Sequence, residues 1–592
     1  MPLFLVLSLC TAVHAQSSGT TSDGLVWSSS GGVVTITGYT GSSNAVNIPA
    51  TIFGLPVTSI GIHAFGSNLT ITSVTFAIPS SVTSIENYAF LNCASLSSVT
   101  LPGSVTSIGD QAFGSCTNLT SIQIPNAVSS IGNLAFFFSG LQSVTVPSSV
   151  TSIGNGAFTY CTNLNAITVD PQNAAYSSGL DGVLFDKNQT TLIQCPGAKA
   201  GNYMVPNSVA TIGSSAFNGC NSLTTVEIPA SVTSIAGNPF YSTTALISIT
   251  VDPSNPNYSN NSDGVLFNKN KTTLIACGGG KSGSYTVPSG VNSIGNSAFG
   301  WCVNLTNVTL PNGVTSIGRS AFDSCSGLIS IQIPNDVATI ETDTFYFCTS
   351  LKSVNIPGSV TSIGAQAFTN CQSLTSVTLS NGLTSIGTGS FEFCTSLASM
   401  IFPSTITVIG DQAFVGCSGL KSAIFMGGAP SMGSSVFLIF PANGFAVYYF
   451  HGAPGFNSPW TDSSGDTYQA VDMGPSSAVA PWLVSNGYAF NTNLASSPNG
   501  DGVSLLLDYA LNLDPTKNQS KSLPKPQVIG NQLSINYYSQ SAGVAYTVQT
   551  SADLINWNTT GVQISGPDAN GMSTATVTNP GQKRFMRLLT VY

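Results

Sequence analysis

Ten of the 13 cysteines recur at one position of a repeated motif, which raises the question of disulfides and metal sites. They are Cys93, Cys116, Cys161, Cys220, Cys302, Cys325, Cys348, Cys371, Cys394 and Cys417. Zinc ligands usually come in pairs about two to four residues apart, so this spacing argues against a metal. Neighbouring copies could bring two thiols near disulfide distance, but a continuous column cannot be fully paired. We expect a buried column, because free cysteine packs as a small hydrophobe, and a structural role for Cys195 and Cys277.

Histidine, the commonest general base in nucleophilic catalysis, is nearly absent from the chain. The three residues are His14, His63 and His451, and the last two lie at opposite ends of the repeat region. A Ser-His-Asp or Cys-His arrangement would have to use one of them alone. The sequence has no glycine-rich phosphate loop and no zinc motif. We therefore predict that the protein is not an enzyme.

One loop has the oxygen ligands of a calcium site. Ser497 opens the run Ser-Pro-Asn-Gly-Asp-Gly, and Asp508 stands at its twelfth position. The run resembles an EF-hand or dockerin-like loop, in which oxygens of Asn499, Asp501 and Asp508 would bind a structural calcium. Ser497 replaces the usual aspartate, and Asp508 replaces a bidentate glutamate. The alternative is a capped loop before a helix, with Asn499 or Asp501 in the N-cap region.

A repeat that fills most of the chain must position these residues. The motif I-G-x-x-A-F-x-x-C-x-x-L-x-S-V-x-I-P recurs with a usual spacing of 23 residues. Its phenylalanines are Phe65, Phe90, Phe113, Phe136, Phe158, Phe217, Phe240, Phe299, Phe322, Phe345, Phe368, Phe391 and Phe414, with Phe437 as a degenerate last copy. One copy cannot bury its own apolar face, but stacked copies cover one another. The sequence therefore predicts a β-rich solenoid of about 13 or 14 coils, counted from these phenylalanines.

Each coil is predicted to hold a short strand and a short helical turn. In the segment 98–102, Val99 and Leu101 point one way while Ser98 and Thr100 point the other, which is the period of a half-buried strand. Pro102 ends this strand because it has no N–H to donate. The Ala-Phe-x-x-Cys segment that follows has near-helical spacing.

The outward strand positions form the predicted binding face, a neutral strip rich in hydroxyl groups. They include Ser98, Thr100, Ser121, Gln123, Ser143, Thr145, Ser330, Gln332, Ser353, Asn355, Ser376 and Thr378. The alternative interpretation is that these side chains only cover the backbone and contact solvent.

These motifs resemble the BspA-like leucine-rich-repeat family of cell-surface proteins, over about residues 30 to 450. The segments 32–39 and 55–60 also resemble the usual N-terminal cap of that family. The resemblance implies a leucine-rich-repeat solenoid whose strand face is concave and binds partners. It implies adhesion to matrix or to neighbouring cells, and it identifies no ligand.

Two copies of the repeat are interrupted by insertions near 170–205 and 252–287 that resemble each other. The segment 181–188 reads DGVLFDKN and the segment 263–270 reads DGVLFNKN, and each continues to Thr-Thr-Leu-Ile. Two apolar runs on either side of a polar turn predict a β-hairpin. We expect both hairpins to project from the solenoid.

The remaining segments suggest the order of domains. An apolar run followed by Val-His-Ala predicts a signal peptide over 1–15, although no Lys or Arg precedes the run. The run is shorter than the roughly 20 residues of a membrane span, and we find no transmembrane segment elsewhere. We predict an N-terminal cap over 16–58, the solenoid over 59–423 and a C-terminal cap over 424–474. Residues 475–592 are predicted to form a short helix, near 503–513, and a small β-sandwich-like module.

The composition restricts the class of partner. Only 6% of the residues are charged, and the net charge is −9. Because no basic patch is present, nucleic acid is not an expected partner. We predict a secreted or cell-surface protein that binds an extracellular protein or glycan through its solenoid. Two alternatives stay open: a structural element of a surface layer or matrix, and a protein that binds ice or crystal surfaces through its hydroxyl strip.

Overall fold

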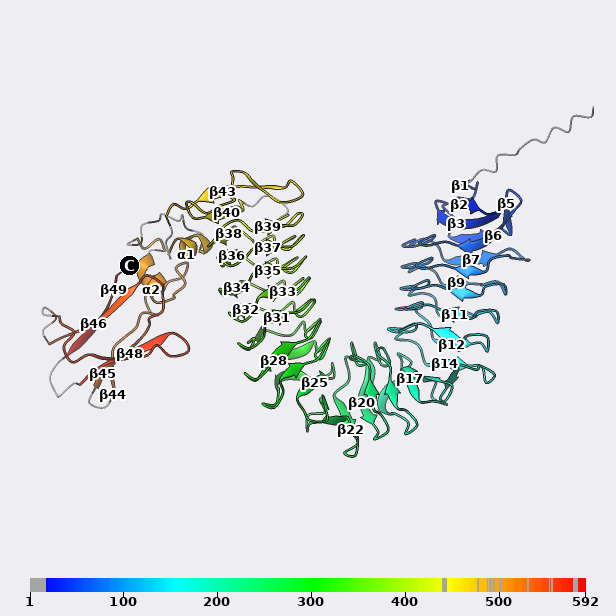
Figure 1. Ribbon diagram of the computed structural model, residues 1–592, viewed down its shortest axis with the longest axis horizontal. Helices are drawn as coiled ribbons and strands as arrows, with labels where there is room; N and C mark the ends of the chain where they lie inside the picture. Colours follow the sequence, from blue (N-terminus) through cyan, green and yellow to red (C-terminus); the bar gives the residue numbers. More distant parts are fainter. Residues whose placement is uncertain are drawn as a thin grey trace, which may run out of the picture. The chain divides into compact units, whose positions relative to one another are not determined.

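The computed structural model describes residues 18–438, 444–475, 479–486, 488, 492, 494, 496–499, 503–529, 532–552, 554, 557–578 and 584–591. The predicted signal peptide and Asp501 lie outside these residues. The chain divides into two compact units, unit 1 up to Gln372 and unit 2 from Ser373 onward. Within each unit the coils stack in sequence order (Figure 1).

The first ladder of unit 1 consists of strands whose residues alternate between core and solvent. In β12 (Ser143–Val146), Val144 and Val146 are buried while the two hydroxyl residues are exposed. β12 pairs in parallel and in register with β14 (Ala166–Val169). The same ladder type includes β4 (Ala45–Ile48), β7 (Ser73–Phe76), β9 (Ser98–Val99), β18 (Ala200–Met204), β20 (Ser222–Ile228), β22 (Ser248–Val251), β26 (Ser282–Thr286), β28 (Asn304–Thr309), β30 (Ser330–Ile331) and β32 (Ser353–Ile356).

A second ladder is built from the Ser-Ile pair of each repeat. β10 (Ser107–Ile108) pairs in register with its neighbours on both sides, and the isoleucine side chain is buried. The other strands of this ladder are β3 (Val33–Tyr39), β6 (Leu55–Ile60), β8 (Ser84–Ile85), β11 (Ser130–Ile131), β13 (Ser152–Ile153), β17 (Thr191–Gln194), β19 (Thr211–Ile212), β21 (Ser234–Ile235), β25 (Thr273–Ala276), β27 (Ser293–Ile294), β29 (Ser316–Ile317), β31 (Thr339–Ile340) and β33 (Ser362–Ile363).

The Ala-Phe-x-x-Cys segment does not form the helical turn that its spacing predicts. Gln111 and Ser115 have positive φ angles of 51° and 56°, which a right-handed helix does not allow. The N–H of Phe113 donates to the carbonyl of Ala135 in the next coil at 2.8 Å, and the N–H of Ser115 donates to Phe137 at 2.6 Å. The prediction of a helical turn was wrong because the amides bond between coils. The segment is a third ladder, made of tight turns.

The core consists of columns that run from coil to coil. The ring of Phe113 stacks on that of Phe90, with centroids 5.1 Å apart, and on that of Phe136, at 5.5 Å. All three rings are completely buried. Stacked aromatic rings add to the free energy that their buried area provides, so a single phenylalanine per coil holds neighbouring coils in register.

Each insertion forms a hairpin and also adds a coil to the solenoid. β15 (Tyr176–Ser178), β16 (Leu184–Asp186) and β17 pair antiparallel, and β23 (Tyr258–Asn260), β24 (Leu266–Asn268) and β25 repeat the arrangement. However, β17 and β25 then pair in parallel with the second ladder. Leu184, Phe185 and Leu192 are buried, so the expectation that the hairpins project was wrong. The coils at the two ends of the solenoid and in the insertions explain why the described residues form about 19 turns, against 13 or 14 copies counted from the phenylalanines.

The first coil of unit 1 is covered by antiparallel strands. β1 (Ser18–Thr20) pairs with β2 (Leu25–Ser30), and β2 pairs with β3. A short strand, β5 (Thr51–Ile52), pairs with β6. The Trp27 side chain is 1% exposed, which shows that this end of the core is shielded from solvent.

Unit 2 continues the same coil pattern and then changes. Its first-ladder strands are β34 (Ser376–Leu379), β36 (Ser399–Phe402), β38 (Ser422–Phe425), β40 (Ala446–Tyr449) and β43 (Ala470–Asp472). Its second-ladder strands are β35 (Ser385–Ile386), β37 (Val408–Ile409) and β39 (Ser431–Met432). A two-stranded hairpin, β41 (Trp460–Thr461) with β42 (Thr467–Tyr468), lies between β40 and β43 in the chain.

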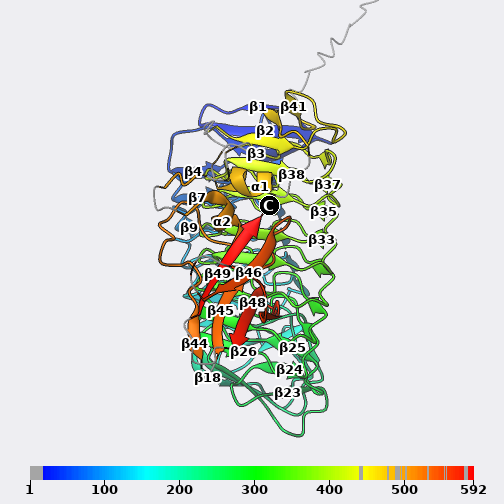
Figure 2. The same cartoon turned by 90° about the vertical axis from the view of Figure 1, so that its left-hand side faces the viewer.

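Over its described residues, the C-terminal part of unit 2 has two helices and two antiparallel sheets (Figure 2). Helix α2 (Leu505–Ala510) lies inside the predicted range, and Ser504 is its N-cap, whereas α1 (Val479–Ser485) was not predicted. One sheet has the order β44 (Gln527–Ile529), β45 (Gln532–Tyr538), β48 (Met572–Thr578) and β47 (Gln563–Ser565). The other consists of β46 (Ala545–Ser551) and β49 (Phe585–Val591). Ile535 and Val548, from different sheets, belong to one buried cluster.

Candidate functional site

All twelve residues of the predicted binding face are exposed to solvent. Each of these side chains stands at a solvent-facing position of the first ladder. The coil neighbours are in register where strands are formed, so that Ser330 lies beside Ser353. The alternation arises because the intervening valines and isoleucines are taken into the core.

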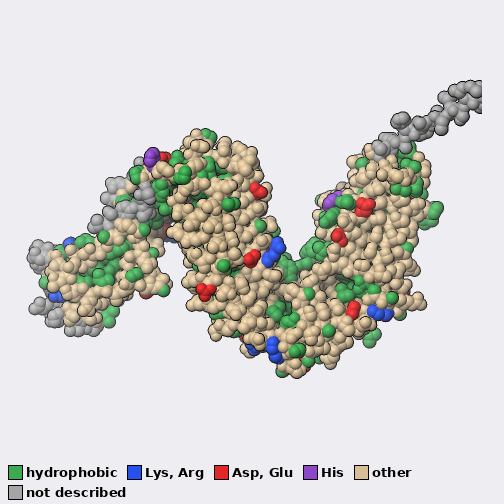
Figure 3. Space-filling view, viewed as in Figure 1, with side chains coloured by type: hydrophobic (Ala, Val, Ile, Leu, Met, Phe, Trp, Pro, Cys, Tyr) green, Lys and Arg blue, Asp and Glu red, His purple; other side chains and the backbone are tan. Residues whose placement is uncertain are grey.

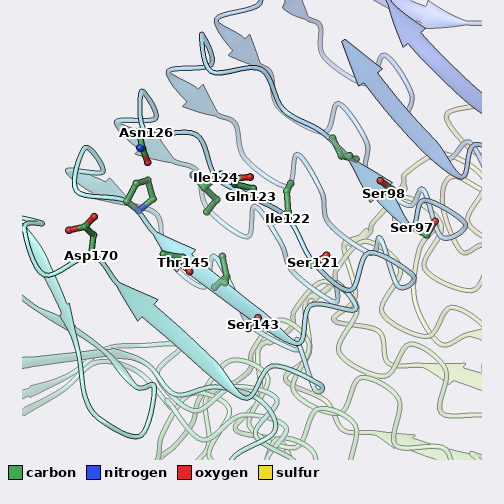
Figure 4. Close-up of a pocket in the computed structure, with 13 residues that line it drawn as sticks. Ser97, Ser98, Ser121, Ile122, Gln123, Ile124, Asn126, Ser143, Thr145 and Asp170 are labelled. Atoms are coloured by element: carbon green, nitrogen blue, oxygen red, sulfur yellow. The ribbon is translucent and has the colours of Figure 1, made fainter. Parts of the chain in front are cut away.

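Five of the twelve residues line one shared hollow in unit 1. This hollow has a volume of about 550 Å³. The predicted residues in it are Ser98, Ser121, Gln123, Ser143 and Thr145 (Figure 4). Three consecutive coils therefore present hydroxyl and amide groups to the same space, and these groups can both donate and accept hydrogen bonds.

Sequence reasoning missed two polar residues at the edge of this hollow. Asn126 and Asp170 both belong to its lining, and Figure 4 shows them on the loops at the ends of the strands. Asn126 directly follows Pro125, and Asp170 directly precedes Pro171. A polar residue next to a proline at a strand end was the signal that could have identified them, because a strand ends there and leaves the side chain at the rim.

The coils that contain the insertions continue the first ladder with different chemistry. Asn202 in β18 donates a hydrogen bond to the carboxylate of Glu227 in β20, at 2.8 Å. Glu227 lines a second hollow, of about 310 Å³, together with Met204 and Asp252. The hydroxyl strip is therefore not continuous. The coils that contain the insertions separate the hollow near Gln123 from the coils that expose Ser330, Gln332, Ser353 and Asn355.

In unit 2 the outward face of the first ladder is partly covered by the chain itself. Ser376 and Thr378 line a hollow of about 360 Å³, to which Ser485 of α1 also contributes. Ile424 stands at an outward position of β38, yet it is completely buried in a cluster with Ala480 and Val484 of the same helix. Helix α1 therefore covers the part of the outward face next to this hollow.

The surface around these residues carries little charge. Figure 3 shows Lys, Arg, Asp and Glu side chains scattered singly over the visible face. The chain has 14 Lys and Arg residues against 23 Asp and Glu. A ligand of the strip would be recognised by hydrogen bonds and shape, since strong electrostatic attraction requires clustered charge.

Two of the three predicted calcium ligands, Asn499 and Asp508, belong to the residues that the structure describes. The Asn499 side-chain amide donates to the carbonyl oxygens of Pro515 and Lys517, at 3.1 and 2.8 Å. Asp508 is 1% exposed in the first turn of α2, and Asp501 lies outside the described residues. The N-cap of α2 is Ser504, three residues beyond Asp501, and not Asn499 or Asp501. Calcium binding stays a prediction, which a calcium titration of the thermal unfolding of the chain would test.

The cysteines and histidines have structural surroundings in the parts of the chain described. The repeat cysteines are buried, and burial raises the pKa of the Cys93 thiol to about 12. The ring of His63 stacks on Tyr88 with centroids 4.7 Å apart, and His451 pairs with Asp472 at 2.8 Å. Over the described ranges, no group of three or more His, Cys, Asp or Glu residues could hold a metal ion.

No helix within the described segments has the length and apolar character needed to cross a membrane.

Comparison with known proteins gives the family. The family model described as BspA type leucine rich repeat region, with six copies, matches residues 39–165, 197–274, 281–371 and 339–439. No curated protein sequence matches the chain.

Solved structures of leucine-rich-repeat proteins are similar to the chain. One is a leucine rich cell surface protein from Faecalibacterium prausnitzii A2-165, with 29% identity, a TM-score of 0.37, and coverage of 70% of this chain and 96% of that chain. A leucine-rich repeat protein from Eubacterium ventriosum ATCC 27560 has 24% identity and a TM-score of 0.35, over 67% of this chain and 93% of the other. The pneumococcal vaccine antigen PcpA has 21% identity and a TM-score of 0.31, over 73% and 93%. Since the family model alone spans more than half of the residues, the chain belongs to the BspA-type leucine-rich-repeat family.

Proposed function

We propose that this protein is a secreted or cell-surface recognition protein that binds an extracellular protein or glycan through the outward face of its first ladder. The observation that carries the proposal is the hollow near Gln123, where exposed hydroxyl and amide groups from three coils line one space. Membership of the BspA-type family supports the extracellular location and an adhesive role.

The chemistry of the hollow favours a neutral, hydrogen-bonding ligand. Ser121, Gln123, Ser143 and Thr145 are exposed and uncharged, and Asp170 at the rim is the one ionisable group in the lining. Hydroxyl and amide groups repeated from coil to coil match the hydroxyl groups of a glycan or the backbone of an extended peptide.

An array of glycans and extracellular-matrix proteins, probed with the intact chain, tests the proposal. We expect saturable binding to one ligand class. Deleting the insertions would be a poor control, because Phe185 and Leu192 belong to the core. Point variants are better: Gln123→Arg and Thr145→Arg place bulk and charge in the hollow, and both should weaken binding at least about tenfold, the effect of about 1.4 kcal/mol.

Thr106→Arg is the matched control, since Thr106 is exposed next to the second ladder and does not line the hollow. Its affinity should stay close to that of the parent chain. Loss of binding with Thr378→Arg alone would move the site to unit 2.

Absence of binding by well-folded protein would overturn the proposal. Self-association of that protein would then favour a structural surface-layer element, and thermal hysteresis would favour an ice-binding role.

A further inference from the structure

Cys195 and Cys277 occupy the place that phenylalanine holds in the regular coils. The N–H of Cys195 donates to the carbonyl of Ala216 at 2.7 Å, and the N–H of Cys277 donates to Ala298 at 2.7 Å. In a regular coil the same bond runs from the phenylalanine N–H to the alanine of the next coil. Each insertion therefore interrupts the phenylalanine column with a cysteine.

This replacement changes the surroundings of the next cysteine along the solenoid. In regular coils the thiol donates to the carbonyl of the phenylalanine in the preceding coil, as in Cys116 to Phe90 at 3.2 Å. The contact from Cys325 to Phe299 is 3.0 Å. Cys220, which follows the first insertion, lies 3.6 Å from the carbonyl oxygens of Cys195 and Pro196.

The second insertion repeats this departure independently. The Cys302 thiol lies 3.8 Å from the carbonyl oxygen of Cys277 and 3.7 Å from that of Gly278. Both cysteines that follow an insertion therefore have longer contacts with carbonyl oxygens than the regular cysteines have, and each has a second cysteine beside it.

The two cysteines of each pair also influence each other's titration. Burial and then the neighbouring Cys220 raise the pKa of Cys195, and the neighbouring Cys277 and then burial raise the pKa of Cys302. All four residues are buried. The Sγ of Cys220 lies 3.6 Å from the carbonyl oxygen of Cys195, and the Sγ of Cys302 lies 3.8 Å from that of Cys277, so each of these thiols lies against the backbone of the other cysteine of its pair.

We propose that Cys195–Cys220 and Cys277–Cys302 are disulfide-forming pairs, while the regular column of cysteines stays reduced. Each bridge forms by thiol–disulfide exchange with a low-molecular-weight disulfide such as oxidised glutathione. Two S–H bonds break and one Sγ–Sγ bond forms, and the two electrons and two protons reduce the small disulfide to two thiols.

The bridges form while the chain folds. Burial and the neighbouring thiol raise the pKa of Cys195 well above its ordinary value, so the folded state holds little of the thiolate that attacks a disulfide. Once formed, each bridge ties the coil of an insertion to the regular coil that follows it. Regular neighbours such as Cys325 and Cys348 each donate to a phenylalanine carbonyl, at 3.0 and 3.2 Å, which leaves their thiols directed away from pairing.

The test is peptide mapping of the intact chain. The protein is unfolded with reductant, refolded in a buffer of reduced and oxidised glutathione, alkylated at low pH and digested with pepsin without reductant. Mass spectrometry should find two linked peptides, joining Cys195 to Cys220 and Cys277 to Cys302. Each link should lower the mass by two hydrogen atoms, and reduction should release four additional thiols for alkylation.

Matched variants distinguish these pairs from chance oxidation. Cys195→Ser should free the thiol of Cys220 and leave the Cys277–Cys302 link intact, whereas Cys116→Ser should leave both links intact. Complete alkylation of the refolded parent chain without reductant would overturn the proposal. Links between consecutive regular cysteines, or between Cys302 and Cys325, would overturn it as well. The measurement on the parent chain needs no variant to fold.

Discussion

Asp110 and Asn133 stand at the same position of adjacent coils, and the side chain of the first binds the backbone of the second. The Asp110 carboxylate accepts a hydrogen bond from the Asn133 N–H at 2.7 Å, and another from the Asn133 side-chain amide at 3.2 Å. Asn87 binds the Asp110 N–H in the same way, at 2.8 Å. Asn133 in turn binds the N–H of Asn155, at 2.9 Å. This polar ladder continues the hydrogen bonding of the second strand beyond its end.

Replacing Asp110 by alanine should destabilise unit 1 by about 0.5–1.5 kcal/mol, the usual net value of a hydrogen bond. The cost stays modest because Asn133 is an exposed residue, so water can replace the lost acceptor. Asp110→Asn retains an acceptor oxygen and should cost less. Hydrogen exchange measures the effect directly, and an unchanged exchange rate at the Asn133 amide in Asp110→Ala would contradict the ladder.

The glycine before this polar position should tolerate no side chain. A Cβ added to Gly132 would lie 2.5 Å from the backbone nitrogen of Asp110, closer than two atoms can pack. Gly132→Ala should force the coils apart and cost about 1–3 kcal/mol, the usual range for overpacking. Gly103→Ala is the control, since nothing lies within 4 Å of its added Cβ. Equal melting temperatures for the two variants would refute the close approach.

The phenylalanine column should dominate the stability of each coil. Phe113→Ala removes a completely buried ring that stacks on two others, so we expect a loss of about 3–5 kcal/mol. Phe138→Ala removes a ring that is 42% exposed and should cost far less. Chemical denaturation monitored by circular dichroism compares the two. A smaller loss for the buried ring than for the exposed one would contradict the packing described.

The period-two alternation of Ser98–Pro102 predicted the first ladder correctly, because apolar residues at alternate positions have one stable arrangement in a half-buried strand. Apolar spacing also predicts a helical turn around Phe113, and that prediction was wrong. Apolar spacing specifies which side chains are buried, but it does not specify whether an amide bonds within its coil or to the next one. The positive φ of Gln111, which settles that question, has no signal in the residue type.

The candidate site was predictable only where the repeat is regular. Ser121 and Gln123 follow from alternation, whereas Asp170 reaches the hollow through the end of a neighbouring strand. The pattern around Leu192 is that of a hairpin, and for this reason the sequence predicts that the insertions project from the solenoid. Their second role in the solenoid depends on parallel pairing with Ile212, a contact between coils that no local pattern encodes.

Stability of the β41–β42 region should depend on pH through Asp462. Its carboxylate accepts hydrogen bonds from the Tyr468 hydroxyl at 2.6 Å, the Ser464 hydroxyl at 2.7 Å and the N–H of Val436 at 3.1 Å. Burial alone would raise the pKa of Asp462, but these bonds to the charged form outweigh burial, and the pKa is lowered. The carboxylate therefore stabilises the folded state above the unfolded pKa of about 3.9.

This stabilisation should be lost as the pH falls through the lowered pKa. We expect thermal unfolding of unit 2 to shift to lower temperature below about pH 4. Asp462→Asn should be less stable at neutral pH and should remove this part of the pH dependence. Asp336→Asn, which changes an exposed carboxyl of unit 1, is the control. The same pH profile in Asp462→Asn and the parent chain would refute this role of Asp462.

Helix α1 should protect the outward face of β38. Val484 is 7% exposed and belongs to one cluster with Ile424 and Phe450, so Val484→Asp would bury a charge without a partner among apolar groups. We expect the helix to detach, at a cost of about 2 kcal/mol or more, and Val484→Ile to keep it in place. Faster hydrogen exchange in β38 and new proteolytic cleavage near 479–486 would report the detachment. Since Ser485 lines the hollow that contains Ser376 and Thr378, detachment would also open that hollow. Unchanged exchange in Val484→Asp would show that Ile424 is shielded without the helix.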